Sequence, residues 1–155
     1  ALYALDAFFD NYDSLYKKFY ATIIGEVPTY IKNKIRNKNN FQFLNYVDKN
    51  HLEQLYATAF CLLYPSLNEG FGYPPLEAMK YGTLVICSAV ASLTEVYGDS
   101  VFYINPYSVN EITTRLIQIT NIDYEKYSKN ALKKYYEINT KQENDLQIIV
   151  EEILK

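Results

Sequence analysis

Five short, mostly apolar runs recur along the chain and limit its fold more than any other feature. Each is four to six residues long and is followed by a turn-forming residue. Apolar runs of this length, without regular polar alternation, are typical of strands that are buried on both faces of a parallel sheet. The runs lie at 19–24, 41–44, 60–64, 84–87 and 101–104.

Segments with helical spacing separate these runs. We expect helices at 1–17, from Pro28 to about Asn37, and after Asp48, which is a suitable N-cap. A further helix should run from Pro74 and Pro75 to Gly82, and another from a capping box at Ser92–Glu95 to Gly98. Two or three more helices are expected between 108 and 155. Strands that alternate with helices predict an α/β domain, a Rossmann-like parallel β-sheet with helices on both faces. Such sheets bind ligands at the carboxyl ends of their strands.

Composition narrows the class of protein. The 155 residues suit one domain, 1–155, and the net charge of −3 without a long basic run argues against nucleic acid as a partner. Cys61 and Cys87 each lie in an apolar run, which predicts reduced, buried thiols of a cytoplasmic protein rather than a disulfide or metal site. We expect neither a signal peptide nor a membrane-spanning segment within these residues, because no stretch has the required pattern or apolar length. It starts at Ala1, inside an expected helix, so we expect a piece of a longer protein.

The segment from Pro65 to Glu77 concentrates groups that suit a phosphorylated, hydroxyl-rich ligand. It follows the third apolar run and enters a helix, where free N–H groups and the helix dipole favour a diphosphate. Two of the five glycines, Gly70 and Gly72, lie here and let a ligand approach the backbone. Glu69 and Glu77 flank the turn and can accept hydrogen bonds from sugar hydroxyls. Taken singly, they also fit a solvated loop residue and an acidic residue near a helix N-terminus.

Several strings in sequence order resemble one known family. P-S-L-N-E-G-F-G-Y-P-P-L-E-A-M resembles the E-x7-E signature of glycosyltransferase family 4, the large retaining family with the GT-B fold. Upstream, I-I-G-E and F-Q-F-L-N-Y-V-D-K-N-H-L-E-Q-L-Y are similar to that family, and so is S-A-V-A-S-L-T-E-V-Y-G-D-S-V-F-Y-I-N-P downstream. The likeness spans roughly residues 15 to 120. It implies the C-terminal, donor-binding half of a GT-B fold.

The resemblance also implies a role for nine residues. Glu69 is the catalytic residue that contacts the transferred sugar, and Glu77 binds the ribose hydroxyls. The other donor-binding residues are Gly70, Phe71 and Gly72 beside the sugar and diphosphate, Pro75 and Leu76 at the phosphates, and Tyr46 and Val47 beside the nucleobase.

The implied reaction moves a hexosyl group from a nucleoside diphosphate sugar to an acceptor with retention, in surface polysaccharide or glycoconjugate synthesis. It needs no cofactor and no metal, and the chain has no D-x-D motif. The acceptor, a glycan or lipid-linked glycan, would bind an N-terminal domain outside this chain, with peripheral membrane association of the full-length protein. Residues 123–155 would form helices that pack toward that domain. An Arg and a Lys that face the diphosphate in the family also lie outside, so we expect this chain alone to be inactive.

Two alternatives remain open. The chain could be a non-catalytic nucleotide-sugar-binding or interaction module that has kept the fold. It could also belong to a sugar-nucleotide epimerase with the same architecture, although such enzymes lack this form of the E-x7-E loop.

Overall fold

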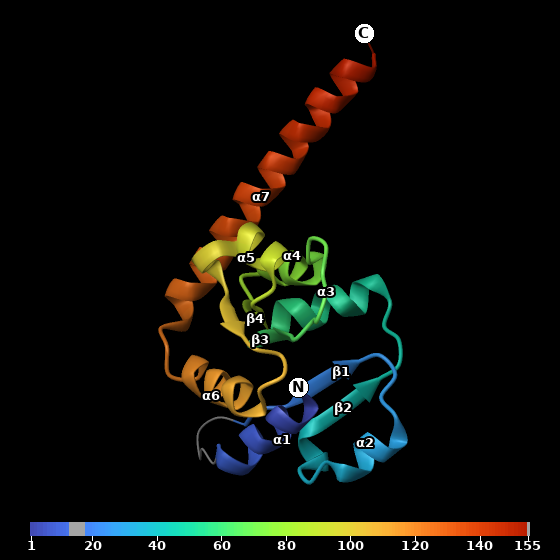
Figure 1. The fold of residues 1–155 in the computed structure, drawn as a ribbon, viewed down its shortest axis with the longest axis vertical. Helices are drawn as coiled ribbons and strands as arrows, with labels where there is room; N and C mark the ends of the chain where they lie inside the picture. The colour runs from blue at the N-terminus through green and yellow to red at the C-terminus, as the bar shows by residue number, and fades with distance from the viewer. Residues whose placement is uncertain (13–17, 155) are drawn as a thin grey trace.

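The computed structural model describes residues 1–12 and 18–154, along which helices and strands alternate (Figure 1). All five expected strands form, with bounds within two residues of those predicted. They are β1 (Ala21–Ile24), β2 (Phe41–Leu44), β3 (Cys61–Tyr64), β4 (Leu84–Ser88) and β5 (Phe102–Ile104).

The helices also match the expected pattern, with shifts at some ends. They are α1 (Leu2–Asn11), α2 (Thr29–Lys34), α3 (Lys49–Thr58), α4 (Tyr73–Met79), α5 (Ala91–Tyr97), α6 (Val109–Ile119) and α7 (Tyr124–Ile153), with 3-10 turns η1 (Lys38–Asn40) and η2 (Gly98–Ser100). The expected first helix is too long: α1 ends at Asn11, and positions 13–17 lie outside the described residues. Asp48 caps α3 as predicted, since its side chain accepts a hydrogen bond from the His51 N–H.

All strand pairs are parallel, which confirms the α/β class. The strands form two groups, however: β1 pairs with β2, and β4 lies between β3 and β5. Within residues 1–12 and 18–154, no strand pairs with the second edge of β1 or of β3. The rings of Phe19 and Phe60, which precede β1 and β3, have centroids 5.2 Å apart. The amino ends of the two sheets are therefore joined by aromatic packing instead of a hydrogen-bonded ladder.

Helices cover both faces of the β3–β4–β5 sheet, as the apolar runs predict. Every residue of β4 is buried. Val85 and Cys87 belong to a core with α4, α5 and α7, whereas Ile86 belongs to a second core with α1 and α6. The lack of polar alternation in this strand thus reflects apolar packing on both sides.

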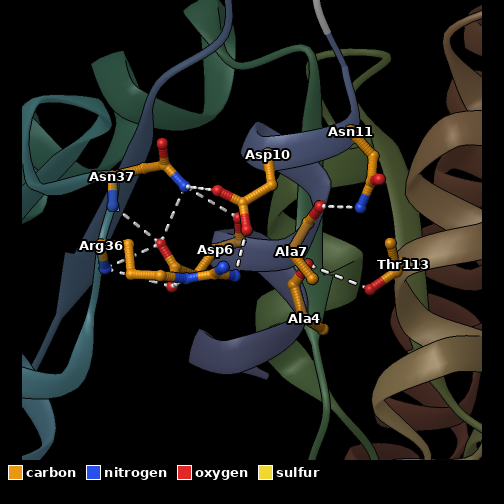
Figure 2. Close-up of polar contacts among 8 residues, drawn as sticks. All are labelled: Ala4, Asp6, Ala7, Asp10, Asn11, Arg36, Asn37 and Thr113. Carbon is orange, nitrogen blue, oxygen red and sulfur yellow. Dashed lines mark hydrogen bonds and ion pairs between the residues drawn. The ribbon is translucent and has the colours of Figure 1, made fainter.

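A buried carboxylate joins α1 to the segment between α2 and β2 (Figure 2). Asp6 is 3% exposed, and its oxygens accept hydrogen bonds from the backbone N–H groups of Arg36 and Asn37, the latter at 2.9 Å. On the other side of α1, the Thr113 hydroxyl of α6 donates to the Ala4 carbonyl at 3.1 Å. Because Arg36 and Asn37 turn their N–H groups toward Asp6, α2 ends at Lys34 and does not continue to Asn37.

These hydrogen bonds also decide the ionisation of Asp6. Burial alone would raise the pKa of this carboxyl, but the bonds from Asn37 and Arg36 outweigh burial and hold the pKa below its ordinary value. Asp6 is therefore a charged group that stabilises the junction between α1 and the β1–β2 unit. The sequence offers no local pattern for this contact, because its partners lie about thirty residues away.

Candidate functional site

The chain leaves β3 at Tyr64, forms a loop over residues 65–72, here called the site loop, and enters α4 at Tyr73. Gly72 ends the loop with a φ of +85°, a left-handed conformation that favours glycine. A Cβ atom at this position would also collide with the side chain of Leu93. Gly70 differs, since a Cβ atom there would have no neighbour within 4 Å. Gly72 is therefore required by the backbone, and Gly70 leaves open space.

Backbone N–H groups are free where the loop meets the helix. Within the described residues, the N–H groups of Gly70, Phe71, Gly72 and Tyr73 donate no hydrogen bond. The Leu76 N–H reaches the Gly72 carbonyl only at 3.5 Å. Consecutive free N–H groups before a helix are an arrangement that binds anions.

Pro74 and Pro75 occupy the first turn of α4, as predicted. Neither has an N–H group, so neither can donate a hydrogen bond to a phosphate. The side chains of Pro75 and Leu76 are buried under the loop, in the core of the domain. Of these two predicted phosphate contacts, only Leu76 therefore has a backbone donor.

Glu69 is held at two points. The Tyr64 hydroxyl donates a hydrogen bond to the Oε2 atom of its carboxylate, and the Ser92 hydroxyl donates to its backbone carbonyl at 2.6 Å. Burial, followed by the hydrogen bond to Glu69, raises the pKa of Tyr64 to about 12, so this phenol stays protonated and continues to donate at neutral pH.

Glu77 is exposed on α4 and also has a tyrosine neighbour. Burial, followed by the charge of Glu77, raises the pKa of Tyr56 on α3 to about 12. Tyr56 in turn makes a small contribution to the raised pKa of Tyr64. The structure thus brings Glu69, the free N–H groups and Glu77 together around this part of α4.

Among the described residues, the structure gives no hydrogen bond between the site loop and the predicted nucleobase neighbours Tyr46 and Val47. They follow β2, in the other sheet, and Tyr46 is 83% exposed. Their predicted position beside a nucleobase remains a prediction.

The prediction that Ser92 and Glu95 form a capping box for the following helix is wrong. The helix α5 begins at Ala91, so its N-cap residue is Val90, two residues before Ser92, and Val90 makes no side-chain capping bond. The Ser92 hydroxyl is used for the Glu69 carbonyl instead, because the site loop packs over the start of α5. The S-x-x-E pattern therefore located the helix start to within two residues and missed a tertiary contact.

A second buried tyrosine supports the site loop. The Tyr97 hydroxyl donates to the Gly72 carbonyl at 2.6 Å, and the side chain is fully buried. None of the residues Tyr56, Tyr64, Ser92 and Tyr97 was predicted to belong to the site. With seventeen tyrosines spread over the chain, tyrosine content alone gives no signal for the three that reach the site.

Other features of the described residues lie away from this site. Burial raises the pKa of both the Cys61 and the Cys87 thiol to about 12, and both cysteines are free. A shallow surface hollow at the start of α7 is lined by charged and polar residues: Asp123, Glu125, Lys126, Lys129 and Asn130. Among the described helices, none combines the length and apolar character needed to cross a bilayer.

Comparison with known proteins agrees with this architecture. The family described as glycosyl transferases group 1 matches residues 2–144. The O-antigen chain mannosyltransferase B of Escherichia coli is 46% identical over 77 residues, which cover 50% of this chain and 20% of the relative. The O-antigen chain mannosyltransferase RfbU of Salmonella typhimurium is 45% identical over 69 residues, which cover 44% and 20%. The match thus spans about a fifth of the length of either relative.

Solved structures share the fold at low sequence identity. The C-terminal domain of a group 1 glycosyl transferase, LpcC, from Francisella tularensis has a TM-score of 0.72 and 23% identity, covering 91% of this chain and 76% of that domain. WaaG, a glycosyltransferase involved in lipopolysaccharide biosynthesis, has a TM-score of 0.64 and 22% identity, covering 75% of this chain and 33% of WaaG. The fold is therefore Rossmann-like and of the GT-B class. This chain belongs to the group 1 glycosyl transferases.

Proposed function

We propose that this chain is the part of a retaining glycosyltransferase that binds a nucleoside diphosphate sugar. The whole protein would transfer the hexosyl group of this substrate to an acceptor. The observation that carries the proposal is the row of free N–H groups from Gly70 to Tyr73, with Glu69 at one end and the exposed Glu77 on the following helix. Donors for a diphosphate thus lie between acceptors for two sets of hydroxyl groups.

Each part of the substrate has a proposed partner. The diphosphate accepts hydrogen bonds from the N–H groups of the site loop, the transferred sugar meets Glu69, and the ribose meets Glu77. Tyr46 and Val47 border the nucleobase. As the bond to the sugar breaks, negative charge develops on the leaving diphosphate, and N–H donors that are already oriented stabilise it. No metal or cofactor takes part in this scheme.

The transferred group is proposed from the relatives. Two of them are named as O-antigen chain mannosyltransferases, which favours a mannosyl group and a role in surface polysaccharide synthesis. The acceptor, a glycan or lipid-linked glycan, would bind a further, N-terminal domain. We also propose that the full-length protein works in the cytoplasm, with peripheral membrane association.

Helix α7 carries an exposed apolar surface near its end. Its last turns expose Ile148, Ile149 and Ile153, which are 55%, 52% and 76% exposed. We propose that this apolar face packs against the acceptor-binding domain, which would remove it from water.

Substrate binding provides the test. We would titrate the chain with UDP, GDP and ADP and with their sugar derivatives, at millimolar concentrations, and follow backbone NMR signals and thermal stability. We expect shifts for residues 66–77 with one nucleotide, and about tenfold weaker binding in Glu77→Ala, because one charged hydrogen-bond acceptor is lost.

A matched control is Glu95→Ala, which removes an exposed carboxylate from the neighbouring helix α5 and should leave binding unchanged. If a folded chain gave no shift with any of these nucleotides or sugar nucleotides, the proposal would fail in favour of a non-catalytic interaction module. Binding centred outside residues 66–77 would instead favour a different enzyme of the same architecture, such as an epimerase.

A further inference from the structure

The last residue of β3 contacts the carboxylate that follows it by five positions. The half-buried Tyr64 donates its hydroxyl hydrogen to the Oε2 atom of Glu69. No other group in the described parts of the chain donates to this carboxylate, so its Oε1 atom is open. Glu69 is therefore tied at one oxygen and presents the other.

The backbone of the site loop is held by different groups. Ser92 donates to the Glu69 carbonyl, and Tyr97 donates to the Gly72 carbonyl, both at 2.6 Å. Both anchors come from α5, whereas Tyr64 comes from β3. Removal of the Tyr64 hydroxyl thus leaves the loop backbone anchored, and what it frees is the side chain of Glu69.

An untied glutamate on a partly exposed loop samples several rotamers and must lose that freedom when it binds a ligand. A side chain already held in one conformation avoids this loss and binds more tightly. The tyrosine hydroxyl suits this purpose, because its raised pKa keeps the proton on the phenol over the whole neutral range.

We propose that Tyr64 is a positioning residue for Glu69, which it holds with Oε1 directed at the transferred sugar. This inference rests on the proposed function, in which Glu69 meets the sugar. It adds a residue whose hydroxyl sets how well the sugar is recognised, while the diphosphate and nucleoside are bound elsewhere. A purely structural tyrosine would instead affect every ligand equally, or none.

The test separates the sugar from the rest of the substrate. The chain is titrated with a nucleoside diphosphate and with the matching sugar nucleotide. The Kd of the nucleoside diphosphate divided by the Kd of the sugar nucleotide measures how much the sugar adds to binding. We expect Tyr64→Phe to reduce this ratio about fivefold, the cost of ordering one free side chain on binding, and to leave the Kd of the nucleoside diphosphate unchanged.

Tyr103→Phe is the matched control. The hydroxyl of Tyr103 donates to the Leu93 and Gly98 carbonyls, burial raises its pKa to about 12, and it makes no bond with Glu69. This variant should keep the ratio. Glu69→Gln should reduce the ratio as well, and Tyr64→Phe added to Glu69→Gln should cause little further loss, because the two residues act through one contact.

The outcomes distinguish the inference from the proposed function. If the Kd ratio falls in Glu69→Gln but is unchanged in Tyr64→Phe, the inference about Tyr64 is wrong and the proposed role of Glu69 stands. A wild-type chain that binds no sugar nucleotide, or binds it no better than the nucleoside diphosphate, overturns the role of Glu69 and the inference with it.

A ligand-free measurement covers the case in which Tyr64→Phe does not fold. The ¹³Cζ NMR signal of Tyr64 reports its titration in the wild type and in Glu69→Gln. The pKa of Tyr64, about 12 beside the carboxylate, should fall in the variant, since the charge of Glu69 contributes to it. An unchanged titration would mean that the phenol and the carboxylate do not interact.

Discussion

Two glycines that look equivalent in the G-F-G string have different physical roles. Gly72 combines a φ of +85° with a close approach of Leu93, and Tyr97 bonds to its carbonyl. Gly70 has neither restriction. The site loop thus depends on one glycine for its shape, and the other leaves room above the free N–H groups.

This difference predicts opposite results for two matched substitutions. Gly72→Ala should lower the free energy of unfolding by about 2–4 kcal/mol, because an L-residue is strained at this φ and its Cβ meets Leu93. Gly70→Ala should change it by less than about 0.5 kcal/mol. Urea unfolding followed by circular dichroism measures both. Equal losses in the two variants would contradict the assigned roles.

The sequence could predict the site loop and not the side chains that hold it. Glu69, Glu77 and the glycines are close together in the sequence, so their spacing carries information. Tyr64, Ser92 and Tyr97 reach the loop only through the packing of β3 and α5 against it. Ser92 shows the competition directly, since a local capping pattern was overridden by a tertiary acceptor.

At the scale of elements, mostly apolar runs were sufficient to locate the strands, and the Asp48 N-cap and the proline positions located helix starts. The partition of the strands into two sheets could not be predicted, because pairing depends on contacts between distant segments. The long final helix was also only partly predictable. Its first half packs on the core through Ala131, Tyr135 and Ile138, whereas its second half has no buried residue.

The second half of helix α7 should therefore be less stable than its first half. Residues 142–153 project from the body of the domain (Figure 1) and have only their own helical bonds, which are marginal in water. We expect their amides to exchange hydrogen at least about 100-fold faster than those of residues 128–138. Hydrogen–deuterium exchange with mass spectrometry measures this difference. Equal protection of both halves at low protein concentration would contradict the prediction.

At the scale of the whole molecule, α1 links parts that the strands do not. Its Thr113 contact lies on the side of α6, and its Asp6 contact lies on the side of β2 (Figure 2). The two sheets share no ladder within the described residues, so this helix and the Phe19–Phe60 contact carry much of the connection between them. A buried charge at such a junction makes the connection sensitive to acid.

The pH dependence follows from the lowered pKa of Asp6. Its folded pKa lies below the unfolded value of 3.8, so its contribution to stability is present above that pH and is lost as the pH falls through the folded pKa. Asp6→Asn should cost about 1–3 kcal/mol at pH 7, and the difference from the wild type should shrink below about pH 4.

Urea unfolding at pH 7 and at about pH 3 compares the two proteins. Asp10→Asn is the control, since the Asp10 side chain is 29% exposed and pairs with the exposed Arg36, so its loss should be smaller. A difference between wild type and Asp6→Asn that stays constant with pH would rule out a charged Asp6 as the cause.

The second edges of β1 and β3 have a practical consequence for handling this polypeptide. Each presents a row of backbone donors and acceptors, and β3 is a wholly apolar strand apart from the Tyr64 hydroxyl. Edges of this kind recruit strands from neighbouring copies. We therefore expect recombinant material to become turbid on concentration and to keep longer when dilute, with precipitation that begins from a correctly folded protein.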